Sequence, residues 1–321
     1  MSQMLTPGRW RSLQATSTDN HVFTIMAFDQ RGTYARMLPD NAGYDTAVKI
    51  KTEVVSALSP HTSAVLLDAT YGMSAALSLS RTSGLLLALE KTGYSGTSTY
   101  RRTDFDPDWS IEKIKQVGAS AVKLLVYYHP EAGELATEIE ELVRSIATDC
   151  HASDIPLFVE PVSYSLDAAV SKSSAEFAAQ RPAIVRETAR RIGGLGADVL
   201  KLEFPVDAAF DDDAAHWRTA CEAISEVAPV PWVLLSAGVD FPVFARQVEI
   251  ACQSGASGFL GGRAIWKECV TMTPAERQQF LQTTGADRLH QLSAVTVEHG
   301  RPWTDFYKPP TFPENWYLAY D

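Results

Sequence analysis

The chain contains eight short runs of apolar residues that are separated by segments long enough to form helices. Most runs are continuous rather than alternating between apolar and polar positions. Such a pattern is typical of strands that are buried on both faces, as in a parallel sheet. The predicted strands cover residues 22–29, 63–68, 85–90, 121–128, 156–162, 197–205, 231–238 and 257–261.

The segments between these strands have the marks of helices. Apolar positions recur at helical spacing within 137–148, and further helices are predicted at 111–117 and at 182–192, the latter led by Pro182. Three predicted helices end in a Gly-Ala pair that leads into the next strand, at Gly118-Ala119, Gly196-Ala197 and Gly255-Ala256. Strand and helix therefore alternate along the chain.

Eight β/α units in one series predict an α/β fold, a single (β/α)8 TIM barrel. A doubly wound open sheet is the alternative, but no GxGxxG motif follows the first strand. We expect one domain over 1–321, with the barrel at about 20–285 and a short N-terminal cover before it. Residues 165–182 are predicted to be a loop. The extension at about 286–321 is rich in aromatic residues near its end, which predicts a packed segment or an oligomer contact.

Composition excludes several classes of function. The 28 basic and 39 acidic residues give a net charge of −11, so no broad basic surface for nucleic acid or anionic lipid is expected. No apolar stretch has the length of a membrane span or of a signal peptide core. The four cysteines and the histidines lack metal-ligand spacing. We expect a cytoplasmic protein with reduced thiols, no metal and no organic cofactor.

Charged residues within three of the apolar runs are the main chemical signal. Lys123 and Lys201 lie inside predicted strands, and Glu160 lies near the end of another. Burying an ammonium group is costly unless the proton is lost or a partner is supplied. The alternative is that each lysine extends from a strand end to solvent. An amine in an apolar site beside a second cation becomes a nucleophile near neutral pH, so we predict amine chemistry on a carbonyl group.

Barrel enzymes place their active site at the carboxyl ends of the strands, where further polar residues occur here. Glycines and an arginine after the last two strands could bind a phosphate through backbone N–H groups and a guanidinium, although each glycine pair alone could be an ordinary turn. Asp68 could contact substrate or orient an amine, or could simply bind a loop. The candidate substrate-binding residues are Asp29, Gln30, Arg31, Asp68, Ser236, Gly238, Gly261, Gly262 and Arg263.

With these residues, the sequence resembles the class I tagatose-1,6-bisphosphate aldolase family. The resemblance runs from about residue 20 to about 305 and rests on several motifs. They are AFDQRG at 27–32, LLALEKTGY at 86–94, DVLKLE at 198–203, LSAGV at 235–239 and GRA at 262–264. The related sulfofructose-phosphate aldolases share much of this set, including SPxxSAVLLD at 59–68.

The resemblance implies that Lys201 forms a Schiff base, that Glu160 transfers protons and that Lys123 is a cationic companion. It also implies a small sugar phosphate as substrate, a ketose 1,6-bisphosphate that is cleaved to dihydroxyacetone phosphate and glyceraldehyde 3-phosphate. The oligomer contact predicted for the C-terminal extension would make the protein a homo-oligomer. Two alternatives stay open. One is cleavage of sulfofructose 1-phosphate to dihydroxyacetone phosphate and sulfolactaldehyde, and the other is a non-catalytic sugar-phosphate sensor.

Overall fold

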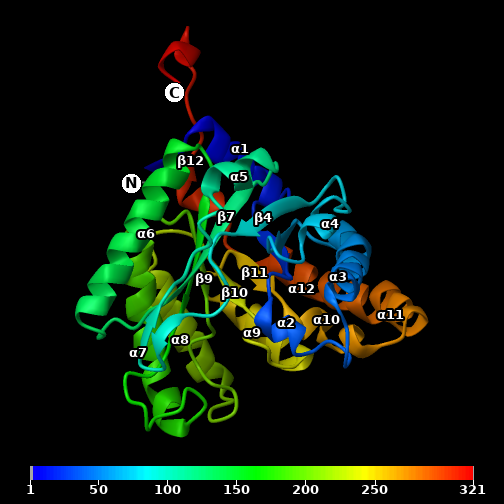
Figure 1. Cartoon of the computed structure of the whole chain (residues 1–321). Helices are drawn as coiled ribbons and strands as arrows, with labels where there is room; N and C mark the ends of the chain where they lie inside the picture. The colour runs from blue at the N-terminus through cyan, green and yellow to red at the C-terminus, as the bar shows by residue number, and fades with distance from the viewer. Residues whose placement is uncertain (1–2, 321) are drawn as a thin grey trace.

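The computed structural model describes residues 3–320, in which a closed barrel of eight parallel strands is surrounded by helices (Figure 1). The predicted (β/α)8 barrel is confirmed, and each of the eight predicted strands is present. The strands pair in chain order, and the last pairs with the first. They are β2 (Phe23–Ala27), β3 (Ala64–Leu67), β4 (Gly84–Ala88), β7 (Ala121–Tyr127), β8 (Leu157–Val162), β9 (Val199–Leu202), β10 (Trp232–Leu235) and β11 (Gly258–Gly261).

The barrel interior is filled by side chains from opposite strands. Phe23 of β2 and Phe158 of β8 are both fully buried, and their rings meet edge to face with centroids 5.6 Å apart. Each fully buried side chain of this size contributes roughly 1.5–3 kcal/mol of transfer free energy. The main surrounding helices are α3 (Tyr44–Leu58), α5 (Ile111–Gln116), α6 (Glu134–Ala152), α7 (Ala175–Gly193), α8 (Ala214–Val227), α9 (Phe241–Gln253), α11 (Pro274–Phe280) and α12 (Ala286–His299).

The start of α7 differs from the prediction. The helix begins at Ala175, so Pro182 lies inside it and the predicted loop is shorter than expected. Ser174 caps the helix, because its side chain accepts a hydrogen bond from the N–H of Phe177. Burial of Phe177 and Ala178 in this first part of the helix favours its continuation past the proline, which can make no bond to a preceding carbonyl.

The N-terminal segment covers the end of the barrel at which the strands begin. Helix α1 (Pro7–Thr16) packs near β4 and β7, and its Arg9 forms a buried ion pair with Asp198 at the start of β9. Strand β1 (Gln3–Met4) pairs with β12 (Tyr307–Lys308), which joins the N-terminal segment to the part of the chain that precedes the C-terminal arm. Helix α12 falls in the segment predicted as an extension, yet it packs against β2 and α9 as part of the helical ring.

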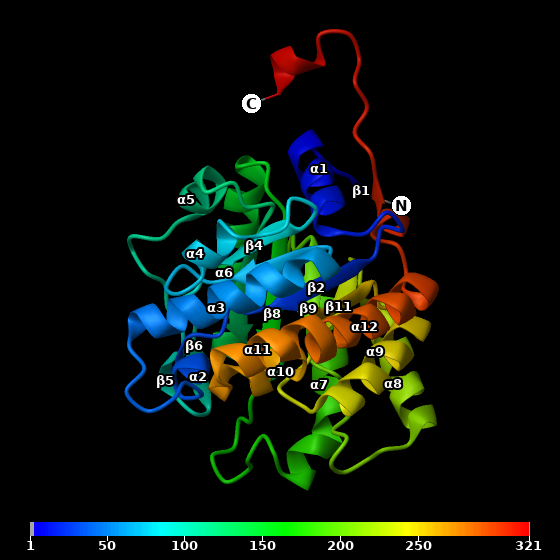
Figure 2. The ribbon, with the colours of Figure 1, turned by 90° about the vertical axis from the view of Figure 1, so that its right-hand side faces the viewer.

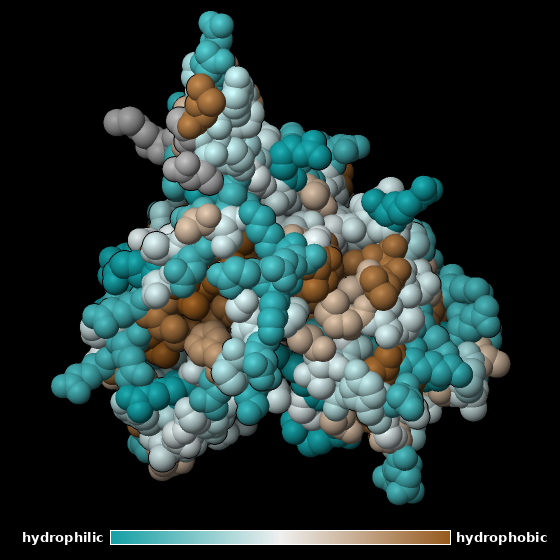
Figure 3. Space-filling view, turned by 45° about the horizontal axis from the view of Figure 1, so that its top comes forward, coloured by the Kyte–Doolittle hydropathy of each residue, from teal (hydrophilic) through white to brown (hydrophobic). Residues whose placement is uncertain are grey.

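Residues 309–320 leave the body of the protein as an arm that ends in a short 3-10 turn, η5 (Trp316–Ala319), as Figure 2 shows. In the space-filling view the arm stands off as a column with a mostly pale surface of intermediate hydropathy (Figure 3). Its exposed large side chains are Phe312, Trp316, Tyr317, Leu318 and Tyr320. Across residues 3–320, no helix combines the length and apolar character needed to cross a membrane.

Candidate active site

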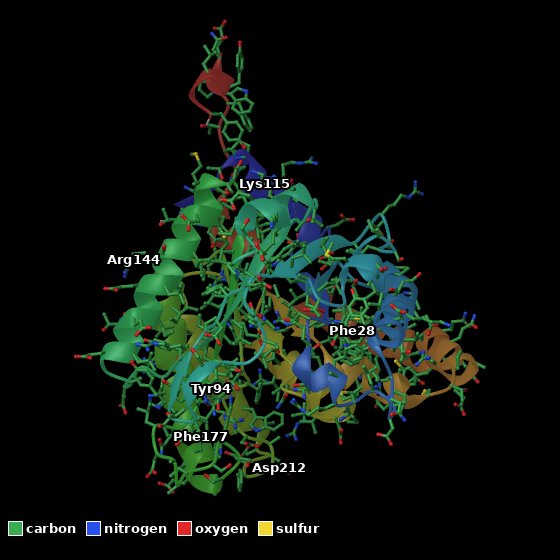
Figure 4. All side chains as sticks on the ribbon, viewed as in Figure 1. Phe28, Tyr94, Lys115, Arg144, Phe177 and Asp212 are labelled. Atoms are coloured by element: carbon green, nitrogen blue, oxygen red, sulfur yellow. The ribbon has the colours of Figure 1, made fainter. Side chains whose placement is uncertain are left out.

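A cavity of about 660 Å³ opens at the end of the barrel where the strands finish. In Figure 4, the labelled Tyr94, Phe177 and Asp212 lie toward this end, and Lys115 lies toward the opposite one. The cavity is surrounded by loops that follow β2, β4, β8, β9, β10 and β11. Six predicted site residues line it, namely Asp29, Gln30, Arg31, Lys123, Glu160 and Arg263.

Three charged residues from neighbouring strands meet at the base of this cavity. One carboxylate oxygen of Glu160 lies 2.9 Å from the Nζ atom of Lys201 and 2.8 Å from that of Lys123. The two amines therefore lie within about 6 Å of each other. All three residues are buried. The structure thus brings together the residues that the sequence predicts as nucleophile, proton-transfer group and companion.

Lys123 contacts two further carboxylates, Asp29 at 2.8 Å and Glu90 at 2.9 Å. Burial favours the neutral amine, but the charges of Asp29, Glu160 and Glu90 outweigh it and hold the pKa of Lys123 well above its usual value. Burial likewise acts to raise the pKa of Asp29, and the neighbouring Lys123 and Lys201 lower it well below its usual value. These carboxylates therefore favour the charged form of Lys123.

Glu90 is a member of this cluster to which the sequence analysis assigned no role. Its carboxylate accepts hydrogen bonds from Lys123, from Arg31 at 2.9 Å and from the N–H of Leu125 at 3.0 Å. Burial acts to lower the pKa of Arg31, but Glu90 and Asp29 raise it above its usual value. The position of Glu90 at the carboxyl end of the predicted strand 85–90 is the signal that could have identified it.

The loops after β10 and β11 hold Arg263 at the cavity wall. Gly238 has φ +85, and a Cβ atom there would lie 2.9 Å from the Arg263 guanidinium, so only glycine allows this approach. Among residues 3–320, no carboxylate forms an ion pair with Arg263. The Ser236 hydroxyl accepts a hydrogen bond from the N–H of Gly262 at 3.1 Å. These loops thus place an uncompensated cation at the cavity.

Five predicted substrate-binding residues do not line the cavity, namely Asp68, Ser236, Gly238, Gly261 and Gly262. Two of them have surroundings that place them away from substrate. Gly261 faces the helical layer, because a Cβ atom there would lie 2.8 Å from Phe244 and 2.9 Å from Ile265. Asp68 is completely buried and forms an ion pair with Lys51, a buried lysine of α3. The sequence analysis did not identify Lys51, since a lysine on an amphipathic helix is usually solvated.

The segment before α7 forms another part of the cavity wall. Lys172 contacts the carboxylate of Glu203 and donates a hydrogen bond to the carbonyl of Ser163 at 2.8 Å. Arg181 forms an ion pair with Asp207 at 3.0 Å. Burial acts to raise the pKa of Glu203, but Lys172 and a Ser163 hydrogen bond keep it below its usual value. These two ion pairs fix the shape of this side of the cavity.

The arrangement as a whole combines groups for covalent and acid–base chemistry. A buried amine lies beside a carboxylate that can accept or donate a proton, and the ammonium of Lys123 orients that carboxylate. Within residues 3–320, no group of three or more His, Cys, Asp and Glu side chains is placed to hold a metal ion.

Comparison with characterised proteins places the chain among aldolases. It is 34% identical to the tagatose 1,6-diphosphate aldolase of Listeria monocytogenes serovar 1/2a, an alignment that covers 94% of this chain and 96% of the relative. Identity to the enzyme of the same name from Lactococcus lactis subsp. lactis is also 34%, over 94% and 99%. Tagatose 1,6-diphosphate aldolase 2 of Streptococcus agalactiae serotype III is 32% identical, over 94% and 99%.

Solved structures of lower identity share the fold. An archaeal fructose 1,6-bisphosphate aldolase superposes with a TM-score of 0.60 at 21% identity, covering 90% of this chain and 98% of the other. The fructose-bisphosphate aldolase of Plasmodium falciparum gives a TM-score of 0.66 at 12% identity, over 94% and 98%. The model of the DeoC/LacD family aldolases matches residues 23–268. The chain therefore belongs to the DeoC/LacD aldolase family.

Proposed function

We propose that this protein is a Schiff-base aldolase that reversibly cleaves a ketose 1,6-bisphosphate such as tagatose 1,6-bisphosphate. The products would be dihydroxyacetone phosphate and glyceraldehyde 3-phosphate. The observation that carries the proposal is the unequal environment of two buried amines that share one Glu160 oxygen. The aldolase relatives favour this substrate over a sulfonated sugar, and one structural neighbour is a Schiff base-forming fructose-1,6-bisphosphate aldolase.

Lys201 is the proposed nucleophile because Lys123 is held in its charged form by three carboxylates. The neutral amine of Lys201 attacks the C2 ketone, and loss of water from the carbinolamine leaves an iminium ion. The iminium then accepts the electron pair of the C3–C4 bond as that bond breaks. Lys201 contacts a single carboxylate, that of Glu160, whereas Lys123 contacts three.

Glu160 is the proposed proton-transfer group. It removes the proton from the C4 hydroxyl as the C3–C4 bond breaks, and it assists protonation of C3 after the aldehyde product leaves. Hydrolysis of the new iminium then releases dihydroxyacetone phosphate and restores the amine. The ammonium of Lys123, 2.8 Å away, fixes the orientation of the Glu160 side chain.

Arg263 is the proposed anchor for the phosphate nearest to the reacting ketone, together with Ser236, Gly238 and Gly262. It is the cavity arginine without an ion-paired carboxylate among the residues described, so its charge is available to an anion. Arg31 and Gln30 would contact the sugar hydroxyls or the second phosphate. The Nε atom of Arg31 and the Oε1 atom of Gln30 are buried and lack a hydrogen-bond partner, so substrate could supply one. Asp29 would reach substrate beside Lys123.

We further propose that the protein is a single domain over 1–321 and that it works in the cytoplasm. Its proposed partner is the sugar phosphate, and no nucleic acid is involved. The four cysteines are free and buried, which suits a reducing compartment. The exposed aromatic side chains of the C-terminal arm support a homo-oligomer contact.

Borohydride trapping tests the reaction directly. Reduction in the presence of tagatose, fructose and sulfofructose phosphates, followed by peptide mass spectrometry, should locate one adduct on Lys201. The Lys201→Ala variant should lose both this adduct and turnover, and Lys123→Met should still form some adduct. An adduct on Lys123 of the unmodified protein would reverse the roles of the two lysines. Absence of an adduct with every ketose phosphate would refute the proposal.

A further inference from the structure

Lys51 is a completely buried charged residue that the proposed mechanism does not use. It comes from α3, and its ammonium nitrogen reaches three acceptors. It donates to the carbonyl of Phe28 at 2.7 Å, to the carbonyl of Gln30 at 3.3 Å and to the carboxylate of Asp68. These three bonds use every N–H of the ammonium, so the buried charge is fully satisfied.

The two carbonyls belong to the residues on either side of Asp29. Lys51 thus holds the backbone of 28–30 from the outside of the barrel, while the Asp29 side chain reaches inward to Lys123 at 2.8 Å. Lys123 in turn contacts Glu160, which contacts Lys201. A continuous chain of short polar contacts therefore joins Lys51 to the proposed nucleophile.

The surroundings of Lys51 make this anchor rigid. Its nitrogen lies 4.5, 5.2 and 5.8 Å from the ring centroids of Phe28, Tyr34 and Tyr71. The Phe28 ring stacks on Trp266 with centroids 3.8 Å apart. Figure 4 shows Phe28 beside α3, on the side of the barrel that faces this helix. The ammonium is thus enclosed by aromatic rings and excluded from water.

Asp68 completes the anchor from the next strand. Its second carboxylate oxygen accepts the N–H of Tyr71 at 2.8 Å, and its carbonyl accepts the N–H of Gly72 at 3.1 Å. A Cβ atom at Gly72 would lie 2.4 Å from that carbonyl, which explains the glycine. Asp68, Tyr71 and Gly72 thus form a turn that presents a carboxylate to Lys51.

We propose that the Lys51–Asp68 pair is a positioning device for catalysis, which fixes the 28–30 backbone so that Asp29 holds Lys123 against Glu160. This inference rests on the proposed aldolase function and goes beyond it, since neither residue touches substrate. Because displacement of a catalytic group by about 1 Å can cost on the order of 100-fold in rate, we expect the pair to govern turnover.

The chain supplies a matched control. Arg9 and Asp198 form another buried ion pair, but at the opposite end of the barrel from the cavity. Asp198 also accepts a backbone N–H, from Leu157 at 2.8 Å, as Asp68 does from Tyr71. One double variant therefore carries Lys51→Met and Asp68→Asn, and the control double variant carries Arg9→Met and Asp198→Asn. Each double variant removes two buried charges.

The measurement is kcat per functional site, with functional sites counted by borohydride-trapped adduct on Lys201. We expect the Lys51 and Asp68 double variant to lose on the order of 10- to 100-fold in kcat per trapped site, and the control to lose thermal stability only. Asp68→Asn alone, which leaves Lys51 bonded to both carbonyls, should recover most of the turnover. If the double variant does not fold, Lys51→Gln with Asp68→Asn provides the same comparison.

Equal kcat per trapped site in the Lys51 and Asp68 variant, the control and the unmodified protein would show that the pair is only structural and would overturn the inference. An equal loss in both variants would overturn it as well. The failure of the proposed function has a different signature, which is the absence of any trapped adduct in the unmodified protein. Loss confined to the Lys51 and Asp68 variant supports the positioning role.

Discussion

Replacing Lys123 by methionine would remove the ammonium that three carboxylates share. Asp29, Glu90 and Glu160 lie 2.8, 2.9 and 2.8 Å from its nitrogen, and the side chain is 1% exposed. Removing one partner of a buried ion pair costs roughly 3–5 kcal/mol, because the remaining charge is left without compensation. For a chain of 321 residues, this free energy corresponds to a fall in Tm of about 4–8 °C.

The effect should depend on pH with a definite sign. The pKa of Lys123 is raised, so its contribution to stability is fully present below its usual value of 10.5 and is lost only as the pH rises through the higher folded value. The pKa of Asp29 is lowered, so its contribution is present above 3.8 and is lost as the pH falls through the lower folded value. The difference between Lys123→Met and the unmodified protein should therefore be largest near neutral pH and shrink in acid.

Thermal unfolding followed by circular dichroism at pH 7 and at pH 3, which lies below the usual Asp29 value of 3.8, measures this difference. Lys172→Met is the matched control, since Lys172 lines the same cavity but is one-third exposed and pairs with the single carboxylate of Glu203. The Lys172 ammonium is partly solvated, and the N–H and hydroxyl of Ser163 would still donate to Glu203, so the control should lose less stability than Lys123→Met. If Lys123→Met and Lys172→Met melt at the same temperature at pH 7, the conclusion that Lys123 stabilises the protein by compensating three buried carboxylates is refuted.

Four further predictions concern the proposed reaction and the arm. Glu160→Gln should still form the adduct on Lys201, yet lose on the order of 10²–10⁴ in turnover, and normal turnover would exclude it from proton transfer. EDTA should leave activity intact, because the iminium is the electron sink; recovery only on adding a divalent ion would contradict this. Arg263→Met should raise the KM for ketose phosphates by about 10- to 100-fold in steady-state assays, and an unchanged KM would remove it from phosphate binding. Truncation after Lys308 should lower the oligomeric state in light scattering without changing kcat, whereas an unchanged mass would leave the arm without this role.

Much of the fold and the centre of the candidate site could be predicted from the sequence, because both depend on local pattern. Continuous apolar runs identify buried parallel strands wherever they occur, and parallel strands in a barrel bring their carboxyl ends to one mouth. Lys123, Glu160 and Lys201 could be identified because a charged residue within an apolar strand contradicts its surroundings. They come from three neighbouring strands, β7, β8 and β9, and this order brings both amines to one Glu160 oxygen.

Other features depended on the tertiary structure. In the sequence, Lys51 looks like an ordinary polar residue of a helix. Its charge can be buried only because other elements bring the Asp68 carboxylate and the carbonyls of Phe28 and Gln30 to it. Helix α7 continues through Pro182 because burial of its first turns outweighs a local signal for a helix start. The protonation of Lys123 likewise follows from three carboxylates on three other strands or loops, and electrostatic interactions of that kind act through space rather than along the chain.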